Sequence, residues 1–265
     1  MGFSRVPERE SGPIWYHFDS LRPEVTREFL HAVFTRRGGV SSGPFSSLNL
    51  GGSVGDDPEA VSENHHRIYT ALGLRASQVV SPYQVHGARV GIVGRHDGGH
   101  IIPDTDALIT AEVGVALLLR FADCVPILMV DPRHHVVALA HAGWRGLVAG
   151  VIPATVAALT KHFGSWPPDL WAGIGPAIGR DHYIVGPDVA AAVQRTLPPS
   201  VKVATQQKGQ WHLDLAAAAR EQLRMSGVTD ISESNMCTAC HTEEWYSHRA
   251  EHGRTGRFGV LAMVT

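Results

Sequence analysis

The chain has 265 residues, of which 44% are hydrophobic and 18% are charged, a composition typical of a globular protein and not of a disordered or fibrous one. Its net charge is only −2, so the sequence offers no basic surface for nucleic acid or for an anionic membrane. The longest apolar run, residues 113–119, is far too short to cross a bilayer.

The N-terminus and the cysteine content both point to a reducing compartment. Residues 1–10 are polar, include Pro7 and lack the apolar stretch of a signal peptide. Three cysteines are an odd number, which speaks against a disulfide framework. We therefore expect a cytoplasmic protein with a flexible N-terminal arm over residues 1–16 and a single catalytic domain over residues 17–265.

The first half of the chain predicts a loop, one helix and a series of short strands. Residues 35–52 are rich in glycine and serine, which suits either a loop facing a substrate or a plain surface turn. A helix is expected from the cap at Asp57 to the stop at Gly73. Strand-like patterns follow at residues 79–85, 88–93, 106–110, 115–121, 127–130 and 135–140.

The second half is mainly helical. Apolar residues recur at helical spacing from Leu147 to Gly164, and Pro153 inside this span should kink the helix or restart it. Further helices are expected over residues 187–197 and from Asp214 to Gly227, with a last strand at 259–264. Strands and helices do not alternate strictly, which predicts an α+β fold: one layered domain of mixed β-sheets flanked by helices.

Three short segments carry the strongest chemical signal. They are Gln84-Val85-His86-Gly87, Ala122-Asp123-Cys124-Val125-Pro126 and His141-Ala142-Gly143-Trp144-Arg145-Gly146. Taken alone, each histidine or cysteine could equally be a buried structural residue. Together, His86, Cys124 and His141 offer two imidazoles and one thiolate, the ligand set of a catalytic zinc with a fourth position free.

The third segment also suggests an anion site. A strand, a glycine turn and a helix follow one another at residues 135–147, and such a junction presents free backbone N–H groups. Arg145 adds a forked donor that suits phosphate. The alternative is a core histidine beside a packing tryptophan.

Beyond these three segments, several others occur in a specific order. They include Thr-Arg-Arg-Gly-Gly-Val-Ser at 35–41, Leu48-Asn49-Leu50, Gly55-Asp56-Asp57, Asp106-Ala107-Leu108, Gly175-Pro176-Ala177-Ile178, Cys237-Thr238, Tyr246-Ser247-His248-Arg249 and Thr255-Gly256-Arg257. From about residue 30 onward the chain resembles the laccase-domain, or polyphenol-oxidase, family, now described as purine nucleoside phosphorylases with adenosine deaminase activity. This chain departs from the family pattern at His65-His66 and at Ala250, where members usually carry arginine.

The resemblance implies a fold, a metal site and a reaction. The fold is that of cytotoxic necrotizing factor catalytic domains, and the metal ligands fall on His86, Cys124 and His141, with zinc as the metal and copper as the alternative. The reaction is attack of phosphate on C1′ of adenosine, inosine or methylthioadenosine. The partners are thus a purine nucleoside and phosphate, and the chain is expected to be a monomer or a homodimer.

Further roles are assigned to polar residues of the same motifs. Arg36, Arg145 and Arg249 are expected to contact phosphate or ribose, and Asn49 to contact the substrate. Asp123 is expected to act with Cys124 and His141, either by orienting a metal ligand or by giving a proton to the base. The usual nucleobase-deaminase pattern is absent, so deamination would need another general acid or base.

Three rival functions remain open. Cys124 and His141 could form the nucleophile and base of a hydrolase in peptidoglycan precursor editing, with Asp123 or a backbone group orienting the histidine. A copper-dependent polyphenol oxidase would need several copper centres, and more paired histidines than these segments supply. A non-catalytic nucleoside sensor would bind through the metal site without turnover.

Cys237-x-x-Cys240-His241 matches the attachment pattern of c-type haem, but that chemistry requires an exported protein. A redox dithiol or a second zinc site would also use this pattern, although no second cysteine pair supports the latter. The inverted zinc-protease pattern at residues 248–252 needs a helix, which the neighbouring Gly253 and Gly256 disfavour.

Overall fold

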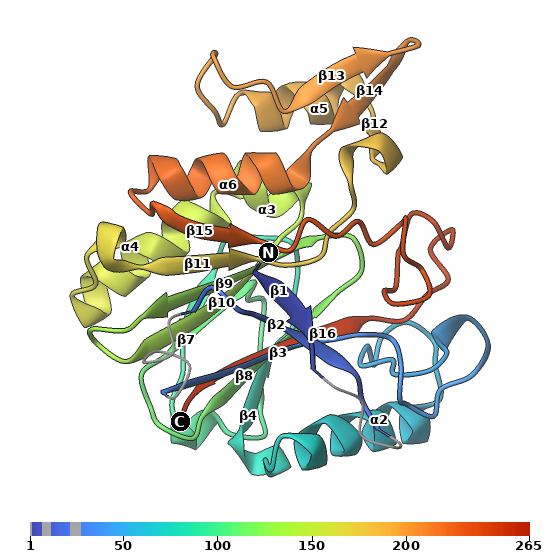
Figure 1. Ribbon diagram of the computed structural model, residues 1–265, viewed down its shortest axis with the longest axis vertical. Helices are drawn as coiled ribbons and strands as arrows, with labels where there is room; N and C mark the ends of the chain where they lie inside the picture. Colours follow the sequence, from blue (N-terminus) through green and yellow to red (C-terminus); the bar gives the residue numbers. More distant parts are fainter. Residues whose placement is uncertain (1, 7–11, 22–27) are drawn as a thin grey trace.

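Two β-sheets form the centre of the molecule (Figure 1). The structure is a computed structural model that describes residues 2–6, 12–21 and 28–265. The first sheet has the strand order β1 (Phe3–Arg5), β2 (Trp15–Phe18), β3 (Phe29–Phe34), β16 (Phe258–Val264), β8 (Ala116–Phe121), β4 (Val79–Pro82) and β6 (Ile101–Ile102). The second has the order β15 (Asp230–Glu233), β11 (Trp171–Ile174), β9 (Val125–Asp131), β10 (Val136–Ala142), β7 (Ala107–Thr110) and β5 (Val90–Ile92).

Both sheets are mixed. In the seven-stranded sheet, β4 runs parallel to β8 and to β6, while the other neighbours are antiparallel. In the six-stranded sheet, β15 is parallel to β11 and β5 is parallel to β7. The predicted strand runs of the first half are confirmed as β4, β5, β7, β8, β9 and β10.

The inner faces of the two sheets pack against each other. In β10, Val137 and Leu139 join a buried cluster with Leu119 and Val260 of the seven-stranded sheet. The alternate residues of β10, Val136, Ala138 and Ala140, belong to a separate cluster on the other face. This two-residue period is what a strand buried on both faces requires.

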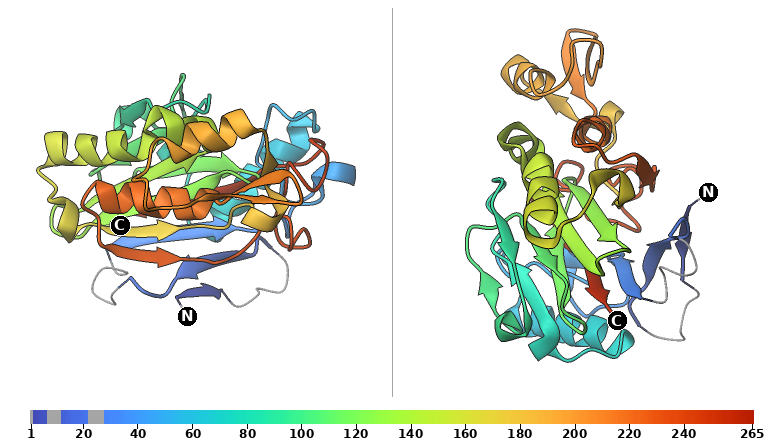
Figure 2. Two further views of the ribbon diagram at one scale, coloured as in Figure 1. Left: turned by 90° about the horizontal axis from the view of Figure 1, so that it is seen from above. Right: turned by 90° about the vertical axis from the view of Figure 1, so that its left-hand side faces the viewer.

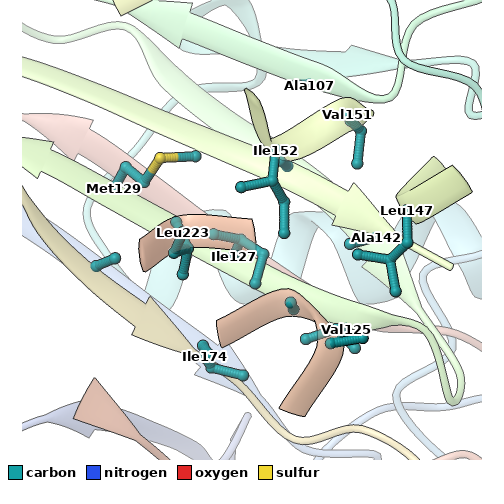
Figure 3. Close-up of a cluster of buried hydrophobic side chains, with 14 of the residues drawn as sticks. Ala107, Val125, Ile127, Met129, Ala142, Leu147, Val151, Ile152, Ile174 and Leu223 are labelled. Atoms are coloured by element: carbon teal, nitrogen blue, oxygen red, sulfur yellow. The ribbon is translucent and has the colours of Figure 1, made fainter. Parts of the chain in front are cut away.

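Helices cover the outer faces, which gives four layers (Figures 1 and 2). Helices α3 (Trp144–Ala149), α4 (Val151–Phe163) and α6 (Leu215–Met225) pack on the six-stranded sheet. Figure 3 shows Leu223 of α6 beside Ile127 of β9 and Leu147 of α3 beside Ala142 of β10, all within one buried cluster. Helix α2 (Pro58–Ala71) covers the seven-stranded sheet through Ile68. The predicted layered α+β fold is confirmed.

A small third sheet lies at one end of the molecule (Figure 1). Its strands are β12 (Ile184–Val185), β14 (Gln210–Leu213) and β13 (Ala204–Gln207), accompanied by α5 (Pro187–Gln194). Short 3-10 helices complete the described chain: η1 (Gly43–Phe45), η2 (Ala76–Gln78), η3 (Arg95–Asp97), η4 (Pro167–Asp169) and η5 (Arg180–His182). Among the described residues, no helix is long and apolar enough to cross a membrane.

The helix signals in the sequence have the expected structural basis. Asp57 accepts a hydrogen bond from the backbone N–H of Glu59 at the start of α2, and Asp214 accepts one from Ala217 in α6. The expected break near Pro153 is confirmed: Gly150 takes φ +83° and separates α3 from α4, with Pro153 in the first turn of α4.

The expected flexible arm is not what the structure shows for the described part of residues 1–16. Phe3–Arg5 forms β1 and Trp15–Phe18 forms β2, which pair with each other and, through β2, with β3. Aromatic packing explains the order, since the rings of Phe3 and Tyr16 stack at 5.1 Å. Residues 1 and 7–11 lie outside the described residues.

Candidate metal centre

The three expected metal ligands lie together. One ligand atom from each of His86, Cys124 and His141 lies within 4.8 Å of the other two. The two imidazole rings are 4.8 Å apart, with 72° between their planes. His141 is buried, Cys124 is half-buried and His86 is exposed, so the cluster opens to solvent on the His86 side.

The sheet topology brings these residues together. His86 lies between β4 and β5, and Cys124 lies between β8 and β9. Each of these connections crosses from the seven-stranded to the six-stranded sheet. His141 stands opposite Pro126 in the pairing of β10 with β9, which sets it close to the second crossing. The cluster therefore forms where the chain passes between the two sheets.

Asp106 holds the cluster in place, a role that the sequence did not reveal. Its fully buried carboxylate accepts hydrogen bonds from the backbone N–H groups of Val85, His86 and Gly87 at 2.7–3.1 Å. One of its oxygens also lies 2.8 Å from Nδ1 of His141. Asp106 thus fixes the His86 turn and directs Nε2 of His141 away from itself, as carboxylates behind metal-bound histidines do.

Close packing around the sulfur leaves no room for another side chain. A Cβ on Gly143 would lie 2.8 Å from Sγ of Cys124 and 3.2 Å from Cδ2 of His86. Glycine is therefore required here for space, since its φ of −79° is open to any residue. His86 and Asp123 have φ of 62° and 82°, an uncommon backbone conformation that often marks functional sites.

The electrostatics favour a thiolate beside a charged imidazole. Burial alone would raise the pKa of Cys124, but charge and hydrogen bonding from His141 and His86 outweigh it and lower that pKa to about 6. Burial opposes the charged form of His141 as well, yet Cys124 and Asp106 raise its pKa to about 9. A bound cation would stabilise the same thiolate while displacing the proton from His141.

The donor set fits a borderline transition metal. One thiolate and two imidazoles suit zinc or copper, and the Asp106 bond to Nδ1 leaves Nε2 of His141 to act as the ligand. Three protein donors leave a further coordination position for water or substrate. His86, Cys124 and His141 would hold the metal.

Cationic side chains surround Tyr183 near this cluster. Burial, followed by the charge of Cys124, raises the pKa of Tyr183 to about 12, while the guanidinium groups of Arg249 and Arg145 act in the opposite direction. Arg249 lies over the Tyr183 ring at 5.1 Å and donates to the carbonyl of Ile184 at 2.6 Å. Arg145 is exposed and stacks on Trp144 at 4.7 Å. Tyr183 was not among the expected site residues.

Two further residues come into the same neighbourhood. Burial lowers the pKa of His248, and the charges of Arg257 and Arg249 and of His86 lower it further. Arg257 is half-buried and donates to the carbonyls of Thr255 and Gly256. Both residues belong to motifs that marked the family, but their spacing alone gave them no role.

Asp123 is a positioning residue in this structure. Its Oδ1 accepts from the hydroxyls of Thr238 and Ser247 at 2.6 and 2.7 Å, and its Oδ2 accepts from the backbone N–H of Arg249 at 2.6 Å. These bonds join the turn at Cys124 to the C-terminal loop. Asp123 thus fixes the turn that carries Cys124, while the carboxylate that reaches His141 is that of Asp106. Its expected proton transfer to the base stays a prediction.

Asn49 is fully buried and fastens two loops together. Its side-chain NH2 donates to the carbonyl of Gly51 and to Asp56, and its side-chain oxygen accepts from the backbone N–H groups of Gly51 and Arg257. The expected contact with substrate stays a prediction.

Arg36 is likewise engaged by the protein itself. Its guanidinium donates to the carbonyls of Ser46 and Thr242 and to Glu251 at 2.7–2.9 Å, and its side chain is only 13% exposed. Glu251 in turn accepts from Ser247 and Thr255. Arg36 thus orders the loop that carries His248 and Arg249, and its expected contact with phosphate or ribose stays a prediction.

The structure lacks the helix that the inverted zinc-protease pattern at residues 248–252 requires. Residues 248–252 form turns and not the helix that this motif needs.

The chain is similar in sequence to proteins of one family over most of its length. Residues 30–265 match the family model described as multi-copper polyphenol oxidoreductase laccase. The chain is 41% identical over 241 residues to the purine nucleoside phosphorylase YlmD of Geobacillus stearothermophilus, covering 87% of each. It is 42% identical over 228 residues to a purine nucleoside phosphorylase of Streptomyces coelicolor, covering 86% of this chain and 92% of that relative.

Solved structures show the same fold. The crystal structure of YlmD from Geobacillus stearothermophilus superposes with a TM-score of 0.91 at 36% identity, over 97% of this chain and 98% of that one. The Bacillus licheniformis protein YfiH gives a TM-score of 0.90 at 30% identity with the same coverage. The chain therefore belongs to the multi-copper polyphenol oxidoreductase laccase family, the family that its sequence motifs indicated.

Proposed function

We propose that this protein is a zinc-dependent purine nucleoside phosphorylase. It would convert adenosine, inosine or methylthioadenosine and phosphate into the free base and a pentose 1-phosphate. Relatives with 41–42% identity carry the name purine nucleoside phosphorylase. The observation that carries the proposal is the cluster of His86, Cys124 and His141 with Arg249 beside it, whose backbone N–H donates at 2.6 Å to Asp123, the neighbour of Cys124.

The arginines would bind phosphate. In the reaction a phosphate oxygen forms a bond to C1′ while the bond from C1′ to N9 of the purine breaks, and its electron pair leaves with the base. Arg145 is exposed and Arg249 is held over Tyr183, so together they can fix a dianion for in-line attack. The metal held by His86, Cys124 and His141 would supply Lewis acidity to an oxygen of the substrate or of bound water.

His248 is the residue best placed to meet the leaving base. Its pKa is lowered by burial and by the nearby cations, so its imidazole is neutral at physiological pH. A neutral imidazole N–H can donate a hydrogen bond to a purine nitrogen that gains negative charge.

Arg145→Gln tests the assignment of the phosphate site. Loss of one charged hydrogen-bond donor should raise the KM for phosphate by about tenfold to a hundredfold, with a smaller change in the KM for adenosine. Arg133→Gln is the matched control, because Arg133 is exposed, pairs with Asp169 and lies at the opposite end of β10. An unchanged KM for phosphate in Arg145→Gln would remove Arg145 from the site.

A second activity would use the same cluster. In this reaction a water oxygen would form a bond to C6 of adenosine, the bond from C6 to the amino nitrogen would break, and ammonia would leave, which gives inosine without phosphate. The metal that His86, Cys124 and His141 would hold would supply Lewis acidity to the water. We propose this deamination as a side reaction, measurable as inosine formation from adenosine in a phosphate-free buffer. It should vanish in His86→Ala and persist in His96→Ala, which removes an exposed histidine of η3.

One observation favours the cysteine-hydrolase alternative. Asp106, His141 and Cys124 are connected in the order acid, imidazole and thiol, which is also the arrangement of a nucleophilic triad. The orienting acid would be Asp106 and not Asp123. Activity toward a peptide or amide that survives chelation but not thiol alkylation would favour this hydrolase, acting on peptidoglycan precursors, over the phosphorylase.

The remaining alternatives are separated by simple assays. A polyphenol oxidase would consume oxygen with a phenol when loaded with copper, and a sensor would bind nucleoside without forming product. We propose a cytoplasmic location because the three cysteines are free thiols, and a monomer or homodimer as the active form.

A further inference from the structure

We propose that His182, Cys237 and Cys240 form a second metal site, which takes zinc or another divalent cation that prefers thiolate. One ligand atom from each of these residues lies within 4.8 Å of the other two. The site shares no residue with the cluster of His86, Cys124 and His141. Two thiolates and one imidazole, with water in the fourth position, match the coordination of zinc in proteins.

A single tight turn presents both thiols. The backbone N–H of His241 donates to the carbonyl of Cys237 at 3.2 Å, so residues 237–241 make one turn of helical type. Side chains three positions apart in such a turn lie on the same side. Cys237 and Cys240 therefore point in one direction, and Sγ of Cys240 lies 3.2 Å from Nε2 of His182.

The third ligand comes from a distant segment that is firmly attached to this turn. Ala177 and Cys237 form a parallel β-bridge, and Thr238 donates its backbone N–H to the carbonyl of Ala177 at 3.0 Å. His182 follows five residues later, at the end of η5. The sequence pattern Cys-x-x-Cys-His suggested His241 as the partner, but the Nδ1 of His241 faces Glu243.

The surroundings of Cys237 suit a thiolate. The backbone N–H of Gly179 donates to Sγ of Cys237 at 3.2 Å, the kind of bond that stabilises a charged sulfur. A Cβ on Gly179 would lie 3.1 Å from this sulfur, so a side chain there would crowd it.

Metal binding here would stabilise two segments that lie next to the cluster of His86, Cys124 and His141. His182 directly precedes Tyr183, and Cys237 directly precedes Thr238, which donates to Asp123. One ion would thus tie the segment that carries Tyr183 to the segment that leads to Arg249. Cys240 and His182 are exposed, so the ion can enter from solution without unfolding.

Cobalt binding to the full-length, reduced Cys124→Ala protein tests the proposal. The chain contains three cysteines, so in this variant a thiolate-to-cobalt absorption band reports on Cys237 and Cys240 alone. We expect the band to saturate at one cobalt per chain and to disappear when zinc is added. Adding His182→Ala or Cys240→Ala should weaken cobalt binding by at least about tenfold, whereas His241→Ala should leave it unchanged.

Thiol protection in the unmodified protein gives a second measurement that needs no variant. Zinc should slow the alkylation of Cys237 and Cys240, read by mass spectrometry of the labelled peptides. Absence of a thiolate band in Cys124→Ala, or equal cobalt affinity with and without His182, would overturn the proposal. So would a Cys237–Cys240 disulfide that forms in air at the same rate whether or not zinc is present.

Discussion

Asp106 connects two of the three expected ligands of the candidate metal centre without being a ligand itself. It accepts three backbone N–H groups from the His86 turn and also bonds to His141. In the sequence it begins an ordinary strand, Asp106-Ala107-Leu108, and nothing in its spacing to His86 or His141 indicates a contact. A carboxylate that acts through other residues is visible only once the fold brings them together.

Replacing Asp106 by Asn tests this positioning role. An amide cannot accept from all four donors, so His141 and the His86 turn should lose their fixed orientation. We expect zinc affinity, measured by competition with a zinc chelator, to fall by about tenfold to a hundredfold. The rate of phosphorolysis should fall in parallel. Asp104→Asn removes the same charge from an exposed position two residues away and should change neither quantity.

Gly143 tests the spatial requirement at the sulfur. In Gly143→Ala the new methyl group would meet Sγ of Cys124 at 2.8 Å, so the thiolate must move and metal affinity should drop. Gly52→Ala places its methyl group in open space and provides the comparison in the same metal titration. If Gly143→Ala bound zinc as tightly as the unmodified protein, the packing around Cys124 would be looser than described.

At the level of elements, the sequence predicted most of the fold because its signals are local. The caps at Asp57 and Asp214, the break expected near Pro153 and the apolar strand runs are all signals that act over a few residues. The strands that were not predicted include β1, β2, β3, β11 and those of the third sheet. Of these, β1 and β2 are short and depend on packing of Phe3, Tyr16 and Phe18 against distant partners. The cluster of Trp15, Tyr16 and Phe18 was the available signal for β2.

In the candidate site, too, some residues could be identified from the sequence, while the roles of others depend on contacts between distant segments. His86, Cys124 and His141 were identified because their family motifs are specific, and the structure brings them together. Asn49 and Arg36 belong to equally specific motifs, and in the structure their side chains hold loops together. A motif marks a residue as important to the fold or to the chemistry, and only its contacts distinguish the two.

His31 links two strands in a way that depends on pH. On β3, its Nε2 accepts a hydrogen bond from the backbone N–H of Phe18 at 2.9 Å, which requires a neutral ring. Burial lowers the pKa of His31 from its ordinary value of 6.5 to about 4; the neighbouring His17 lowers it further, and Asp19 opposes this. Above pH 6.5 the ring is neutral in both the folded and the unfolded chain.

Between pH 6.5 and 4 the unfolded chain binds a proton that the folded chain excludes. The free energy of unfolding should therefore decrease as the pH is lowered through this range. A shift of this size corresponds to at most about 3 kcal/mol in the free energy of unfolding. In His31→Gln the amide oxygen can still accept from Phe18 but does not titrate. The free energy of unfolding of this variant should therefore decrease less on acidification. Urea unfolding at about pH 7 and about pH 4.5 measures the difference, and equal losses in both proteins would contradict a buried neutral His31.

At the scale of the whole molecule, the two stacked sheets explain where the chemistry lies. The chain crosses from one sheet to the other at His86 and again at Cys124, and the C-terminal loop with His248 and Arg249 is fastened to the second crossing by Asp123. The apolar core is left intact, while the polar residues gather at the crossings. Such a site can be tuned by its loops without repacking the sheets.

Stoichiometric phosphorolysis with and without metal tests the central claim most directly. The purified protein is stripped of metal with a chelator, divided, and one half is restored with one equivalent of zinc per His86–Cys124–His141 cluster. With adenosine and phosphate, the restored protein should release adenine and pentose 1-phosphate in equal amounts, and the stripped protein should release neither. Adenine release that needs no phosphate, or that proceeds equally in the stripped protein, would contradict a zinc-dependent phosphorylase.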